Sequence, residues 1–90
     1  MATTKFQLGR LVATPGALEA VPLHDIKAAL ARHHSGDWGE VCESDGALND
    51  EAITDGSRIL SAYVSSNDTK FWIITEADRS CTTVLLPSEY

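Results

Sequence analysis

Polar and apolar residues alternate along the C-terminal third of the chain. Residues 58–64, 71–75 and 80–86 each place every second side chain on the same face, which is the period of a β-strand. Two runs of turn-forming residues, 65–69 and 76–79, separate the three segments. The pattern therefore predicts a three-stranded antiparallel meander.

Both faces of the predicted sheet carry apolar residues. In the first strand Ile59 and Tyr63 lie on one face, and Leu60, Ala62 and Val64 lie on the other. We expect helices to cover one face. The second face should be partly buried as well, which points to a docking surface or a homodimer contact.

The N-terminal part changes from a period of two to a helical period. Residues 5–13 alternate weakly and predict a strand. Thr14, Pro15 and Gly16 then favour a helix start, because Thr caps free amides and Pro tolerates the first helical position. This short helix should end near Val21.

A second helix is predicted to begin at Pro22 and to stop at Ser35 and Gly36. Apolar or aromatic residues recur along it at spacings of three and four, which marks one buried face. The residues on this face are Leu23, Ile26, Leu30 and His33.

The segment that follows is acidic. Asp37 favours a further helical turn that reaches Glu43. Ser44 and Asp45 then resemble a helix start, and the helix should end at residues 55–56. Its predicted apolar face carries Leu48, Ala52 and Ile53.

Length and composition place these elements in one domain. Ninety residues suffice for a single hydrophobic core, and 43% hydrophobic with 22% charged residues is ordinary for a globular chain. The predicted fold is therefore a single α+β domain over residues 1–90. An N-terminal strand and two to three short helices pack on the C-terminal meander.

The net charge of −6 is concentrated in the middle of the chain, where no Lys or Arg occurs between Arg32 and Arg58. Such a segment repels phosphate, so direct nucleic-acid binding is disfavoured. It is instead our candidate surface for binding a protein partner. The candidate residues are Asp37, Trp38, Glu40, Glu43, Asp45, Asp50, Glu51 and Asp55.

Trp38 leaves two interpretations open. It lies between Gly36 and Gly39, a loop-like setting, and Trp is common at interaction hot spots. A Trp can equally close the end of a small core.

No metal or cofactor is expected. His33, His34, Cys42 and Asp37 have the residue types of a zinc site, but adjacent histidines on a helix point about 100° apart. Cys42 and Cys81 are expected as thiols of a reducing compartment. No stretch is apolar enough for a membrane span, so we expect a cytoplasmic protein.

A second candidate site surrounds the predicted turn at 76–79. Glu76 and Asp78 could act as a carboxylate pair with Arg79, and His34 could join them as a base. The alternative is a solvated turn in which Arg79 pairs with a neighbouring acid.

Four motifs resemble a family of small uncharacterised proteins found on bacterial plasmids and integrative elements. They are FQLGRLVATPGAL (6–18), SGDWG (35–39), GSRILSAY (56–63) and WIITEADRSCTTVLLPSEY (72–90). The family has no established activity, so the resemblance implies no catalytic residues. It implies a context in which small acidic proteins act on host defence machinery.

Three hypotheses follow. The first is a non-enzymatic mobile-element protein that binds and inhibits a host defence protein, of the anti-CRISPR or anti-restriction type, through its acidic surface. The second is a small hydrolase or nuclease that uses His34, Glu76, Asp78 and Arg79. The third is a dimeric plasmid accessory protein with an element-encoded partner.

Overall fold

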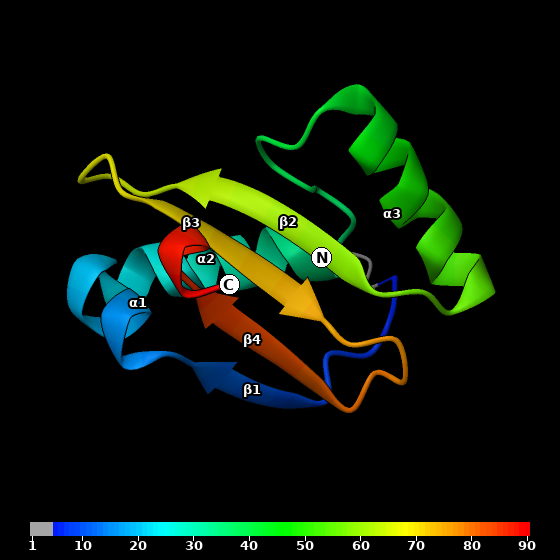
Figure 1. Ribbon diagram of the computed structural model, residues 1–90, viewed down its shortest axis with the longest axis horizontal. Helices are drawn as coiled ribbons and strands as arrows, with labels where there is room; N and C mark the ends of the chain where they lie inside the picture. Colours follow the sequence, from blue (N-terminus) through cyan, green and yellow to red (C-terminus); the bar gives the residue numbers. More distant parts are fainter. Residues whose placement is uncertain (1–4) are drawn as a thin grey trace.

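The computed structural model describes residues 5–90 and shows an α+β fold of three helices and a four-stranded sheet. Figure 1 shows the arrangement. The elements are β1 (Arg10–Ala13), α1 (Pro15–Ala20), α2 (Leu23–His34), α3 (Glu43–Asp55), β2 (Ile59–Val64), β3 (Lys70–Thr75), β4 (Cys81–Leu85) and the 3₁₀ turn η1 (Pro87–Glu89).

The predicted meander is confirmed, and the sheet contains one strand more. β2, β3 and β4 pair antiparallel in sequence order, while β1 joins the far side of β4 in parallel. The order is therefore β1-β4-β3-β2, and β4 lies inside the sheet. The N-terminal strand was predicted, but its place in the sheet beside β4 was not.

The N-terminal strand is shorter than the predicted range 5–13. Its first cross-strand bond runs from the Arg10 amide to the Ser80 carbonyl. Before this point the chain turns towards the end of α2, where the Lys5 amide bonds to the His34 carbonyl. These other partners keep residues 5–9 out of the sheet.

Helices α1 and α2 begin where the sequence predicts. The Thr14 hydroxyl accepts a hydrogen bond from the Ala17 amide, and Pro15 occupies the first helical position of α1. Pro22 precedes α2, which ends at Ser35. Within residues 5–90, no helix has the length and apolar character that crossing a membrane requires.

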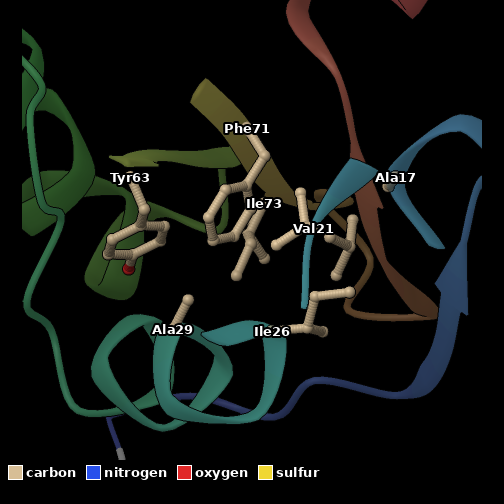
Figure 2. Packing of buried hydrophobic residues seen from close by; sticks show 8 residues of the cluster. Ala17, Val21, Ile26, Ala29, Tyr63, Phe71 and Ile73 are labelled. Atoms are coloured by element: carbon tan, nitrogen blue, oxygen red, sulfur yellow. The ribbon is translucent and has the colours of Figure 1, made fainter. Parts of the chain in front are cut away.

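The main core lies between these two helices and one face of the sheet. Figure 2 shows side chains of α2 and of the α1 end meeting Tyr63, Phe71 and Ile73 of the strands. Side chains of β2 alternate between the two faces of the sheet. Ile59, Ser61 and Tyr63 point to the helix-covered face and are buried, while their neighbours in β2 are not.

Two predictions for the acidic segment are wrong. Residues 37–42 form no helical turn, because Gly39 makes a parallel bridge to Ala62 instead. On the predicted apolar face of α3, Ala52 is buried and Ile53 packs against the core, but Leu48 is 61% exposed and Asn49 is buried instead. Helix α3 also begins after Cys42, with no side-chain cap.

The second face of the sheet is covered in part by the chain itself. Tyr90, at the end of η1, packs edge-on against Trp72 with 5.5 Å between ring centroids. In Figure 1, η1 lies in front of the sheet and α2 behind it. Glu89 fixes this turn by accepting hydrogen bonds from the Thr14 hydroxyl and the Leu86 amide. Part of the burial expected there is therefore supplied by the chain itself.

Gly39 offers a test of the bridge to β2. Its φ of +73° is unfavourable for other residues, and an added Cβ would meet the Ala62 carbonyl oxygen at 2.0 Å. Gly39→Ala should lower the free energy of unfolding by about 3 kcal/mol, since backbone strain adds to the loss of the hydrogen bond from the Glu40 amide to the Ala62 carbonyl. Urea unfolding measures this.

Gly56→Ala is the matched control. Gly56 also has a positive φ, +79°, but nothing lies within 4 Å of the added Cβ. Strain alone should cost about 1–2 kcal/mol there. Equal losses for the two variants would contradict a close approach at Gly39.

Candidate functional site

Helix α3 lies beside the outer edge of β2, away from the other helices (Figure 1). Asn49 joins the two elements: its amide nitrogen donates to the Leu60 carbonyl at 2.8 Å, and its oxygen accepts from the Leu60 amide at 3.2 Å. The side chain thus pairs with the strand as a further strand would. Trp38 and Glu40 pair with Ala62 in the same way, so this edge is covered.

Trp38 belongs to the core, which is the second of its two interpretations. It is 7% exposed and packs with Ala52 and Ile59 beneath α3. Its indole N–H donates to the Asp50 carboxylate at 3.0 Å. Trp38 therefore supports α3 from below and leaves the exposed contact to other residues.

Arg79 holds the other end of α3. Its guanidinium donates to the carbonyls of Ala52 at 2.8 Å and of Ser57 at 2.7 Å. The last turn of α3 contains no basic residue of its own, so Arg79 supplies the cation that a helix C-terminus favours. The β3–β4 turn and α3 are fixed together by this one side chain.

The remaining candidate residues are exposed carboxylates. In residues 5–90, the side chains of Glu40, Glu43, Asp45 and Glu51 have neither a hydrogen bond nor an ion pair. Asp55 accepts a bond from the Ser57 amide, and hydrogen bonding to the Ser57 side chain and then to this amide keeps the pKa of Asp55 below its ordinary value.

Asp37 differs from these acids. It forms a two-pronged ion pair with Arg32, at 2.7 and 3.2 Å, which lowers the pKa of Asp37. Arg32 in turn lies over the Tyr63 ring, 4.9 Å from its centroid. The charge of Asp37 is thus largely compensated by Arg32. The Asp50 carboxylate is not paired with a cation but accepts the indole N–H of Trp38.

The second candidate site does not take the form of a carboxylate pair. Asp78 accepts the Ser80 amide at 3.0 Å, and Arg79 is directed to backbone carbonyls. His34 and Arg79 both pack against Phe6, at 5.9 and 5.7 Å. Arg79 donates to the Glu76 backbone carbonyl at 3.2 Å, but across residues 5–90 no hydrogen bond joins the side chains of any two of His34, Glu76, Asp78 and Arg79.

A chain of buried polar groups runs through the core. The His33 ring contacts the Ser61 hydroxyl at 2.5 Å through Nδ1 and the Thr75 hydroxyl at 2.8 Å through Nε2. Thr75 contacts Thr82 at 2.8 Å, and Thr82 donates to the Leu8 carbonyl at 2.7 Å. All four side chains are fully buried.

The direction of this chain follows from its end. Because Thr82 gives its only proton to Leu8, Thr75 must donate to Thr82, and His33 Nε2–H must donate to Thr75. Ser61 then donates to Nδ1. His33 is therefore neutral, with its proton on Nε2, and burial lowers its pKa to about 3.

A serine beside a histidine resembles a nucleophile with its base, but neither group can be reached from solvent. The contact is structural. The sequence did indicate that His33 lies on the apolar face of α2. Its partners were not predicted, because Thr and Ser at alternating strand positions resemble ordinary β-formers.

The metal-binding interpretation has no geometry to support it in residues 5–90, where no group of three or more His, Cys, Asp or Glu side chains is placed to hold an ion. Both nitrogens of His33 are occupied by hydroxyls. Cys42 and Cys81 are free thiols, and Cys42 is exposed.

Comparisons with protein-family models, curated proteins and solved structures find no match to this chain. The surface described above is therefore the feature from which a function can be proposed.

The buried histidine predicts a pH dependence of stability. The unfolded chain binds a proton on His33 near pH 6.5, whereas the folded protein resists it until about pH 3. The free energy of unfolding should therefore fall with decreasing pH below 6.5, by up to about 1.4 kcal/mol per pH unit from this group.

Urea unfolding between pH 7.5 and 5 tests this, with His33→Gln as the variant and His24→Gln as the control. His24 is an exposed imidazole on the same helix, outside the buried chain. Removing His33 should flatten the slope and removing His24 should keep it. Parallel curves for His33→Gln and the parent protein would contradict a neutral buried ring.

Proposed function

We propose that the protein is a non-enzymatic inhibitor, encoded on a mobile element, that binds a host defence protein through α3. The target surface is a basic one that ordinarily holds nucleic acid. The observation that carries the proposal is the group of exposed carboxylates on α3, held on a firmly anchored helix with no cation of its own.

The charge density of α3 supports this target. Five carboxylates lie on thirteen residues, or one per about 4 Å at a rise of about 1.5 Å per residue. One strand of duplex DNA carries a charge per about 3.4 Å. The charge density of α3 along its axis is therefore similar to that of one strand of a phosphate backbone, which is the charge that a basic nucleic-acid site accepts.

Anchoring makes the charged surface ready to bind. Three contacts hold α3. Asn49 fixes its middle to β2, Arg79 fixes its C-terminal end, and Trp38 bonds to Asp50 from below. A surface that is ordered before binding loses less conformational entropy when the complex forms.

Leu48 adds an apolar contact within the acidic surface. It is 61% exposed and lies three and seven residues before Glu51 and Asp55, so the three share one side of the helix. Apolar centres with charged rims are typical of protein interfaces. Charge would set the rate and specificity of association, and Leu48 would add buried area.

The resemblance to proteins of plasmids and integrative elements supplies the biological setting. Elements that enter a new host encounter CRISPR effectors and restriction enzymes, both of which bind nucleic acid through basic grooves. An acidic helix on a small domain suits occupation of such a groove.

Pull-down of purified CRISPR effector and restriction complexes by the immobilised protein tests the proposal. A retained complex should bind the double variant Glu43→Lys/Glu51→Lys about tenfold or more weakly, because two contact charges are reversed. Binding should also weaken as salt is raised, and the target's own nucleic acid should compete.

Glu19→Lys combined with Glu76→Lys is the matched control, since it changes the net charge equally at positions outside α3. Its affinity should remain within about twofold of the parent. The proposal fails if no complex is retained, or if both double variants lose affinity equally.

A further inference from the structure

The two edges of the sheet differ. The β2 edge is covered by Asn49 and by residues 38–40. The β1 edge has no element beside it in Figure 1, and the burial of β1 is low along its first three residues. Leu11 is 56% and Val12 is 42% exposed. An uncovered apolar edge strand is a ready template for another strand.

The outward backbone groups of β1 follow from its pairing. Arg10 and Thr14 donate their amides to β4, so Val12 between them also directs its backbone groups inward. Leu11 and Ala13 consequently direct their N–H and C=O groups outward. Within residues 5–90 these groups have no backbone partner.

Two copies of this edge complement each other about a two-fold axis through Val12. In an antiparallel arrangement centred there, Leu11 of one copy and Ala13 of the other exchange both backbone hydrogen bonds, which gives four in total. The two Val12 residues form the close pair at the centre, with Cα atoms about 4.5 Å apart.

The same register brings opposite charges together. Arg10 falls opposite Thr14 of the second copy, and the Thr14 hydroxyl holds the Glu89 carboxylate at 2.6 Å. Strand alternation places Arg10, Val12 and Thr14 on the face that η1 covers, so Arg10 meets Glu89 across the interface. Among residues 5–90, Arg10 has no ion pair within its own copy.

We propose that the protein forms a homodimer by antiparallel pairing of β1 with β1, which makes one continuous eight-stranded sheet. The acidic helices then lie at its two far edges, separated by more than about 34 Å, which is seven strand spacings. This exceeds the screening length of about 8 Å at physiological salt, so the net charge opposes pairing little. The dimer does not depend on the function proposed for α3, although it would present two copies of that helix.

Sedimentation equilibrium from micromolar to millimolar protein tests the pairing. The parent chain should approach the mass of a dimer, and Val12→Lys should stay monomeric because two like charges meet on the axis. Val64→Lys is the matched control: the same residue type, also 42% exposed, on a different strand. It should dimerise as the parent does.

A charge reversal tests the ion pair separately. Arg10→Glu should weaken dimerisation about tenfold, because it sets two carboxylates together. Lys27→Glu changes the net charge equally from the exposed side of α2 and should have little effect. A parent chain that remains monomeric throughout, or equal effects within either pair of variants, would overturn the proposal.

Cross-linking gives an answer even if Val12→Lys fails to fold. In a chain whose native thiols are replaced by Cys42→Ser and Cys81→Ser, Val12→Cys should form a disulfide-linked dimer when oxidised glutathione is added. Val64→Cys should not. Absence of the Val12→Cys dimer, or equal cross-linking at the two positions, overturns the register.

Discussion

The one-way chain of hydrogen bonds from Ser61 through His33, Thr75 and Thr82 to the Leu8 carbonyl joins five separate segments of the protein. It links three strands, the end of α2 and the N-terminal segment inside a core that water does not reach. Each group is satisfied only by the next one along, so the loss of any member leaves a buried polar atom unpaired. No buried side-chain nitrogen or oxygen in residues 5–90 lacks a partner.

The acidic surface depends on this core through a short series of contacts. Trp38 packs edge-on against the His33 ring, 5.9 Å away, and Phe6 contacts both rings. Trp38 also bonds to Asp50 of α3, and Arg79, whose guanidinium lies 5.7 Å from the centroid of the Phe6 ring, donates to the Ala52 carbonyl of the same helix. A neutral His33 lets these aromatic groups pack without a buried charge. The carboxylates of α3 are thus presented by a helix whose base is fixed in the core.

The sequence predicted what local periodicity determines. The meander, α1 and α2 were confirmed, because alternation and capping act over a few residues. The parallel addition of β1 was missed, since pairing between distant segments leaves no local pattern. Periodicity also placed Leu48 instead of Asn49 against the sheet, because hydrophobicity does not reveal a side chain that pairs with a strand edge. The sequence left open whether Trp38 is buried, for a related reason. Its burial depends on contacts with Phe6, which is distant in sequence, and with His33, which resembled a zinc ligand.

The position of β4 has a consequence for how the chain folds. β4 pairs with β3 through a short turn, but its other neighbour is β1, and the pair Arg10 and Cys81 is separated by most of the chain. Closing so long a loop is entropically unfavourable until many contacts compensate for it. The hairpins of β2, β3 and β4 can form early from local contacts, whereas β1 has no site to join before β4 is in place. We therefore expect β1 to dock late in folding, and the edge that it presents to solvent to form only once β4 is in place.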